Sequence, residues 1–417
     1  MNIGYACITL GLPGVEMKNC IMKNADKDRL MFLIGHNLNS LSSIIDYNIQ
    51  NDIGMFRMSS DLIPFGSSLA KELDWEKVYS KTLTEIKNKI KNAGMRVSMH
   101  PGQYTVLNSP TELVVERAIN DLDYHTKVMD CLELGAEHKI IIHLGGAYGD
   151  KEQAKKRFVL RYNELSSAVK SRLVLENDDK LFNIEDVLET AFLTGMPVVY
   201  DNLHNALNPA DKFYKDIEWV NKCAATWTKK DGPQKVHYSQ QHPDKKPGSH
   251  SETIAIDIFL EFYQQLTGMN IDIMLEVKDK NLSAIKCINC VTNKGINKLE
   301  TEWAHYKYFI LERSPEHYNA IRKLLKDKST YPALEMYRMI EMSLRTPITN
   351  SNAINTAQHV WGYLKDKASE AERKRFQNAL QRLECGEGEV QSIKNILFAM
   401  ARKYKENYLL NSYYFYL

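Results

Sequence analysis

The sequence lacks the marks of a membrane or exported protein. No apolar run is long enough to span a bilayer, and the N-terminus has no basic stretch leading into an apolar signal core. The 7 cysteines are irregularly spaced, which argues for reduced thiols. Cys287 and Cys290 form a single Cys-x-x-Cys pair without a second pair, so no zinc site is expected there. These absences predict a cytoplasmic protein.

A strong net charge is also missing. The 54 Lys and Arg residues nearly balance the 52 Asp and Glu residues, and the formal charge is +2. Overall charge therefore does not indicate a nucleic-acid-binding protein, and any contact with DNA must be local. Lys229, Lys230, Lys245 and Lys246 flank one predicted strand and are candidates for such a contact, with a solvated loop as the alternative.

Short apolar runs alternate with longer amphipathic segments over the first two-thirds of the chain, a pattern typical of a parallel sheet wrapped in helices. Helices are predicted at residues 28–49, 75–92, 112–134 and 151–170. The predicted strands are residues 3–8, 54–58, 95–99, 139–144, 172–175, 197–200, 235–238 and 271–277. Eight such units predict an α/β protein with a TIM (β/α)8 barrel at residues 1–290. A linker at 291–313 and a C-terminal all-α domain at 314–417 should follow, because the last part is rich in Lys, Arg, Glu and Leu with helical periodicity.

Metal-binding residue types stand at the ends of the predicted strands. His100, His143, Glu176, Asp201, His237 and Glu276 each end a different strand, His204 follows Asp201 by three positions, and His250 lies in the next loop. Because the strand ends of a TIM barrel meet at one mouth, five imidazoles and three carboxylates should converge there. So many N and O donors predict a multinuclear site of zinc or manganese type, and clustered metals suit phosphodiester hydrolysis.

The segment 98–104 (SMHPGQY) joins the third predicted strand to a tight turn. Pro101 and Gly102 prevent its continuation as a helix or a strand, so His100 should end the strand. Gln103 and Tyr104 then project an amide and a flat ring into solvent. Both groups suit contacts with nucleobases.

Six motifs in the first 285 residues resemble those of the UV damage endonuclease family, in the same order. They are 98–104 (SMHPGQY), 143–149 (HLGGAYG), 175–179 (LENDD), 201–209 (DNLHNALNP), 235–237 (KVH) and 247–250 (PGSH). This family is a TIM barrel, related in architecture to endonuclease IV. Its members use manganese ions to nick DNA immediately 5′ of UV photoproducts and some other lesions.

The resemblance implies a ligand set for up to three manganese ions. That set is His100, His143, Glu176, Asp201, His204, Lys235, His237, His250 and Glu276. It further implies catalytic roles for Glu176, Lys235 and His237. Gln103 and Tyr104 would probe the damaged duplex, and Tyr5 would contact the lesion pocket. Damaged double-stranded DNA is therefore the expected partner, and no obligate protein partner is evident.

Lys235 is an unusual member of that set. It precedes His237 by two residues on one strand, so both side chains should face the barrel interior. Divalent ions repel a protonated ammonium. The amine is then either neutral or converted by carbon dioxide to a carbamate, unless Lys235 turns toward the start of the strand and pairs with a carboxylate there. The resemblance favours the carbamate, since family members carry a modified lysine at this place.

The C-terminal residues depart from this family. Segments 358–363 and 408–410 resemble an uncharacterised helical domain of other bacterial proteins. His359 and Trp361 are candidates for DNA contact, but an aromatic helix core is favoured because interior Trp and Tyr are common.

Three functions remain open at this point. The first is the DNA-repair endonuclease. The second is a metal-dependent sugar isomerase, which also places carboxylates and His at a barrel mouth. The third is a lesion-binding scaffold in which the metals are structural.

Overall fold

The computed structural model describes residues 1–417, which divide into two compact units. The first unit comprises Met1–Thr9, Gly14–Ile254 and Ile258–Ile285. The second comprises Leu10–Pro13, Ala255–Asp257 and Lys286–Leu417. No helix combines the length and the apolar character needed to cross a membrane.

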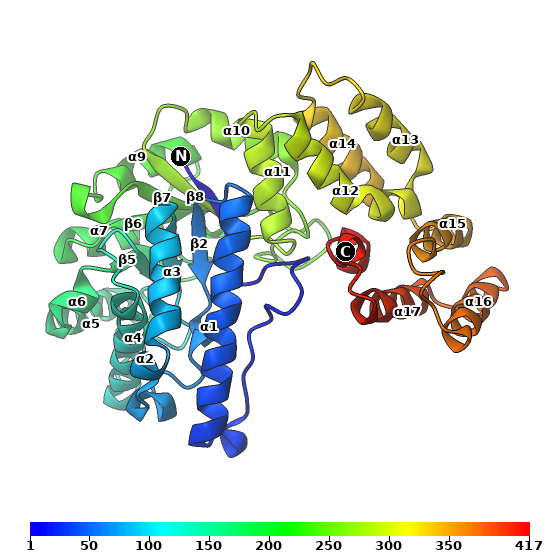
Figure 1. The fold of residues 1–417 in the computed structure, drawn as a ribbon. Helices are drawn as coiled ribbons and strands as arrows, with labels where there is room; N and C mark the ends of the chain where they lie inside the picture. The colour runs from blue at the N-terminus through cyan, green and yellow to red at the C-terminus, as the bar shows by residue number, and fades with distance from the viewer. The chain divides into compact units, whose positions relative to one another are not determined.

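The first unit is the predicted TIM barrel, with eight parallel strands in sequence order surrounded by helices (Figure 1). The strands are β1 (Ile3–Ala6), β2 (Met55–Met58), β3 (Arg96–Met99), β4 (Lys139–Ile142), β5 (Leu173–Glu176), β6 (Val198–Asp201), β7 (Gln234–Tyr238) and β8 (Ile271–Leu275). Closure comes from parallel pairing of β1 with β8. Each strand overlaps the prediction, and the differences are confined to the strand ends.

The helices of this part of the chain follow the strands. They are α1 (Lys27–Gln50), α2 (Trp75–Val78), α3 (Ser80–Asn92), α4 (Glu112–Cys131), α5 (Lys151–Glu164), α6 (Ser167–Lys170), α7 (Ile184–Thr194), α8 (Asn202–Leu207), α9 (Asp216–Ala224), α10 (Ile256–Gln265) and α11 (Asn281–Val291). Two predicted helices are each broken in two. The second break occurs because Leu165 is extended and the Ser166 side chain accepts a hydrogen bond from the Val169 amide, which starts a new helix.

Side chains of alternate residues fill the barrel in layers, because successive side chains of a strand point to opposite faces. One layer is apolar and contains Met55, Met274, Ile141, Val174 and Val199. The residue two positions further along each of these strands carries a polar group at the mouth: Arg57, Glu276, His143, Glu176 and Asp201. Strand periodicity therefore places the polar groups together above an apolar layer.

The opposite end of the barrel is closed by buried charges. The Arg96 guanidinium contacts Asp272 at 3.0 Å and donates hydrogen bonds to the carbonyl oxygens of Glu137 and Asp231. Nearby, the Lys139 ammonium lies 2.5 Å from an Asp231 carboxylate oxygen. These charges are paired, as buried charges must be.

The second unit is helical. Its helices are α12 (Ile296–Arg313), α13 (Pro315–Leu324), α14 (Ala333–Leu344), α15 (Asn350–Trp361), α16 (Glu370–Glu384), α17 (Val390–Lys403) and α18 (Asn407–Leu410) (Figure 1). Most of the residues predicted as a linker, 291–313, are occupied by α12. Leu299, Trp303 and Ile310 are buried on one side of this helix, so it forms part of the helical core.

Aromatic packing stabilises the helical unit. The Trp361 ring stacks on Phe376 with ring centroids 4.4 Å apart and planes at 12°. His359 is exposed. For Trp361 the structure thus agrees with the favoured interpretation of an aromatic core.

Candidate functional site

A single buried carboxylate, Glu176, lies at the centre of the barrel mouth. Its Oε1 is 2.8 Å from His237 Nδ1 and 3.6 Å from His204 Nδ1. Its Oε2 is 3.2 Å from His100 Nε2 and 3.7 Å from His143 Nε2. Four imidazoles from four segments of the chain therefore surround one acidic side chain that is only 1% exposed.

Glu176 belongs to three groups of residues whose ligand atoms lie within 4.8 Å of one another. The groups are His100, His143 and Glu176; Glu176, His237 and Glu276; and Glu176, Asp201 and His204. Seven of the nine predicted ligands are thus brought together. His250 lies outside these groups, although the charges of Glu276 and His204 act on it.

Hydrogen bonds orient the imidazoles as metal ligands. The Nδ1 atoms of His100 and His143 lie 3.0 Å and 3.3 Å from the carbonyl oxygens of Pro101 and Glu176. A carbonyl only accepts, so both Nδ1 atoms carry a proton and Nε2 is the atom that faces Glu176. A contact between Nε2 and a carboxylate oxygen is favourable only when a proton or a cation lies between them.

Buried polar atoms give a second indication of a cation. His237 Nε2 and Asp201 Oδ2 have no hydrogen-bond partner. Unpaired buried polar groups are costly, and metal coordination would satisfy both. The donor set of imidazole nitrogens and carboxylate oxygens fits divalent transition metals.

The acidic and basic groups of the mouth shift one another's pKa. Burial raises the pKa of Asp201 to about 6, and the Glu176 charge acts in the same direction. Burial opposes the charged form of Glu176 too, but His237 and His143 hold the pKa of its carboxyl well below the ordinary value. Although burial lowers the pKa of His204, the Asp201 and Glu176 charges outweigh it and raise that pKa to about 9. Cations entering the site must therefore displace protons.

Arg57 is a member of the site that sequence reasoning missed. It is the last residue of β2 whose side chain faces the barrel interior, and it forms an ion pair with Glu276. The pairing neutralises one carboxylate and fixes its orientation. Arginine does not bind metal ions and was therefore not among the predicted ligands. Its spacing of two residues from Met55, which faces the interior, could have indicated that Arg57 faces the interior as well.

Lys235 faces the interior beside His237, as strand periodicity predicts, and both side chains are fully buried. Its Nζ has no hydrogen-bond partner. Burial, followed by the charge of Arg96, lowers the pKa of Lys235 well below its ordinary value. The alternative of pairing with a carboxylate is not seen: Asp272, its neighbour in β8, is bound by Arg96 and the Asn2 amide.

Tyr5 does not lie where it was expected. It is completely buried, and its hydroxyl donates a hydrogen bond to Asn48 of α1 at 2.9 Å. Its strand neighbour Ala6 packs with the interior residues, so Tyr5 must point outward to the helices. This placement contradicts the predicted contact with a lesion pocket.

The four lysines proposed as a local DNA contact do not form one cluster. Lys229 and Lys230 lie in the turn before β7, whereas Lys245 and Lys246 follow that strand. Five residues of strand span about 17 Å, so the two pairs are at opposite ends of the barrel. Lys245 at the mouth also contacts Glu252 at 2.6 Å.

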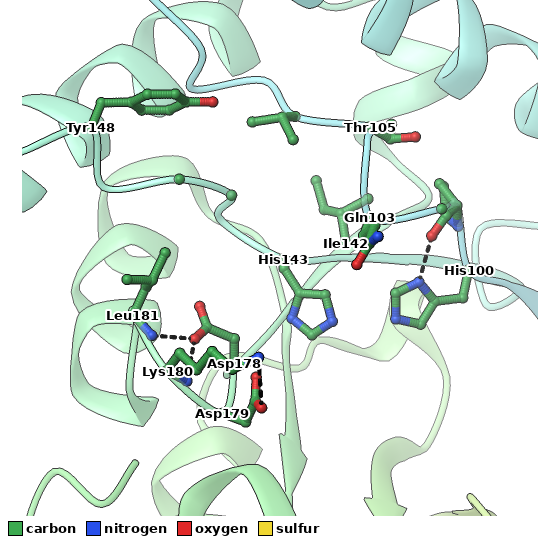
Figure 2. Close-up of a pocket in the computed structure, with 15 residues that line it drawn as sticks. His100, Gln103, Thr105, Ile142, His143, Tyr148, Asp178, Asp179, Lys180 and Leu181 are labelled. Carbon is green, nitrogen blue, oxygen red and sulfur yellow. Dashed lines mark hydrogen bonds and ion pairs between the residues drawn. The ribbon is translucent and has the colours of Figure 1, made fainter. Parts of the chain in front are cut away.

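Gln103 and Tyr104 are exposed beside the metal-competent cluster, as predicted, and Tyr104 is 75% exposed. Gln103 lines a cavity of about 370 Å³ together with His100 and His143 (Figure 2). Tyr104 lines a second cavity of about 610 Å³, which His100 also borders. The turn that carries the pair thus separates two cavities next to the cluster.

Comparisons with known proteins find similar chains. A family model described as "UV-endonuclease UvdE" matches residues 1–307, and one described as "Protein of unknown function (DUF1722)" matches residues 307–417. A UV DNA damage endonuclease of Clostridium perfringens is 38% identical over 395 residues, which cover 94% of each chain. One of Bacillus pumilus is 30% identical over 290 residues, 68% of this chain and 90% of that relative. The crystal structure of SacUVDE has a TM-score of 0.65 at 34% identity and covers 72% of this chain and 99% of that chain.

Binding of divalent metal ions is expected to release protons and to strengthen as the pH rises toward 9. His204 is protonated below a pKa of about 9 in the metal-free protein, and it must lose that proton to coordinate an ion. Isothermal titration of metal-free protein with Mn²⁺ in two buffers of different ionisation enthalpy measures the protons released. The variant His204→Asn should release fewer. Equal heats in both buffers would contradict this expectation.

Proposed function

The chain belongs to the UV-endonuclease UvdE family and is a DNA-repair endonuclease, and from this premise we propose that it nicks the phosphodiester backbone immediately 5′ of UV photoproducts and some other lesions. Manganese, as up to three ions, is the proposed cofactor, and damaged double-stranded DNA the substrate. The observation that carries the proposal is the buried Glu176 carboxylate ringed by four imidazoles. Neither the sugar isomerase nor the non-catalytic scaffold agrees with family membership.

Some side chains at the mouth would bind the metal ions, and others orient those ligands. Divalent ions held by these residues would supply a nucleophile at neutral pH and stabilise charge on the phosphate. Glu176 is central enough to serve more than one ion, while the imidazoles are held in position by backbone carbonyl oxygens. Arg57 keeps Glu276 ionised and in place. We assign catalytic roles to Glu176, His237 and Lys235, and place His250 at the edge of the ligand set.

Lesion selectivity is assigned to the exposed turn. Unstacking a duplex costs a few kcal/mol and costs least at a damaged step. A side chain that replaces lost stacking therefore favours damaged DNA without reading its sequence. Gln103 and Tyr104 are exposed, and they lie beside the cluster that would cut the backbone.

We also propose that Lys235 carries a carbamate. Its amine is buried and has no hydrogen-bond partner, and burial lowers its pKa well below the ordinary value, which favours the neutral amine. A neutral amine adds to the carbon of carbon dioxide and loses one proton, which leaves an anionic carboxylate on Nζ. The new group would turn a lysine, which divalent ions repel, into a ligand that they attract.

Replacement of Glu176 tests the metal mechanism. Glu176→Ala should abolish nicking of an oligonucleotide with one photoproduct while the circular dichroism spectrum stays native, because the shared ligand is lost. Metal content should fall as well. Glu189→Ala, which removes an exposed carboxylate on α7, is the matched control and should nick at the wild-type rate. Unchanged turnover in Glu176→Ala would remove the multinuclear mechanism.

The double substitution Gln103→Ala with Tyr104→Ala tests lesion probing. Loss of one base–aromatic stack costs about 1–3 kcal/mol, so binding to damaged duplex should weaken roughly ten- to a hundredfold. Binding to undamaged duplex should change much less. Fluorescence anisotropy at fixed salt compares the two, and Tyr104→Phe serves as the control that keeps the ring. An equal loss on both duplexes would show that the pair makes only backbone contacts.

The carbamate is tested with ¹³C-labelled bicarbonate. One carbamate carbon resonance is expected, and it should vanish in Lys235→Gln. The matched control is Lys139→Gln, which removes another fully buried lysine whose ammonium is bound by Asp231 and the Ser171 carbonyl. A high-resolution map of metal-loaded protein should show the added atoms on Lys235 Nζ. A bare Lys235 in that map, or a resonance that survives in Lys235→Gln, would refute the assignment.

A further inference from the structure

Tyr148 is a second exposed aromatic residue at the barrel mouth. It stands in the loop between β4 and α5 and is 50% exposed. It lines the same cavity as Gln103 and His143, and its ring reaches from its own loop toward the segment of Gln103 and Thr105 (Figure 2). An aromatic side chain therefore borders the cavity beside the metal-competent cluster.

The backbone at Tyr148 is unusual for a residue with a side chain. Its φ is 51°, in the left-handed region. Such a conformation is strained for a non-glycine residue and is often found at functional sites. The ring is half exposed, so full burial does not compensate for this conformation.

The Tyr148 ring is held in place over a glycine. A Cβ atom on Gly146 would lie only 2.8 Å from the ring, so the ring packs directly against the backbone two residues earlier. The same relation holds in the neighbouring loop, where a Cβ on Gly102 would lie 2.6 Å from the Tyr104 ring. In each loop, a tyrosine ring thus packs directly against the backbone of a glycine, where a larger residue would not leave room for the ring.

Hydrogen bonds join the two tyrosine-bearing loops. The buried Asn108 side chain, from the loop before α4, donates to the Gly146 carbonyl oxygen at 2.8 Å. Arg157 of α5 donates from Nε to the Asn108 carbonyl oxygen at 2.9 Å, and its guanidinium lies 5.5 Å from the Tyr148 ring centroid. The loops are therefore pre-organised as one surface, which lowers the entropic cost of binding.

We propose that Tyr148 is a second stacking residue, which receives a nucleobase unstacked at the lesion. Stacking on aromatic rings tolerates every base, as lesion recognition requires. Tyr104 and Tyr148 would then contact the distorted duplex from two adjoining loops, with Asn108 and Arg157 as positioning residues. This inference rests on the proposed function, because it needs damaged DNA at the mouth.

Tyr148→Ala is the first test. Its affinity for a duplex with one photoproduct should fall roughly ten- to a hundredfold, with little change on undamaged duplex, as expected for the loss of one stack. Tyr148→Phe keeps the ring and should bind within about twofold of wild type by the same principle. Phe192→Ala is the matched control, since Phe192 is 89% exposed near the end of α7, just before β6, and so lies away from the mouth.

Gly146→Ala separates stacking from a general loss of structure. The added methyl group should displace the Tyr148 ring and weaken damaged-duplex binding without touching DNA. In a Tyr148→Ala background the same change should have no further effect. Equal effects of Gly146→Ala in both backgrounds, or wild-type affinity of Tyr148→Ala, would overturn the inference.

Fluorescence of 2-aminopurine identifies the base. The probe is placed opposite the lesion in one duplex and next to it in another, and quenching by wild type but not by Tyr148→Ala marks the stacked position. Absence of a Tyr148-dependent difference at both positions would count against stacking. If wild type nicks the lesion while Tyr148→Ala matches it in every measurement, only this inference fails. If wild type does not nick, the proposed function fails first.

Discussion

One carboxylate buried among imidazoles is the constraint on which this site depends. Glu176 cannot remain ionised in a low-dielectric interior without positive charge nearby. Four imidazoles surround it, and Arg57 pairs with the neighbouring Glu276 carboxylate. Imidazole nitrogens that face a carboxylate need protons or cations between the groups. A site of this kind can exchange protons for metal ions, and the barrel holds the side chains that take part in the exchange.

The barrel supplies the precision that such a site needs. Its strands place one inward side chain every second residue, so Glu176 and Asp201 stand above an apolar layer that includes Val174 and Val199. Paired charges such as Arg96 with Asp272 close the other end. Recognition, in contrast, is left to loops at the mouth, where exposed groups such as Gln103 and Tyr104 border the cavities.

Not every relative carries a counterpart of the whole helical unit. The Bacillus pumilus relative matches 68% of this chain over 90% of its own length, so a protein named UV DNA damage endonuclease exists without most of the helical region. The Clostridium perfringens relative matches 94% of this chain and therefore includes most of it. Within the unit, buried contacts such as Trp361 on Phe376 account for residues that could have been taken for DNA contacts.

The barrel, the family and most of the cluster could be predicted from the sequence. Alternating apolar and amphipathic segments define the β/α units, and ligand-type residues at strand ends must meet at one mouth. The sequence also determined that Lys235 and His237 share a face, because their spacing of two is a property of any strand. Tertiary structure alone decided the direction of Tyr5, since a strand buried on both faces has no polar alternation to mark its inner side. The pairing of Arg57 with Glu276 was likewise beyond sequence. It depends on where segments distant in sequence come to lie in space, and residue type and spacing carry no record of that.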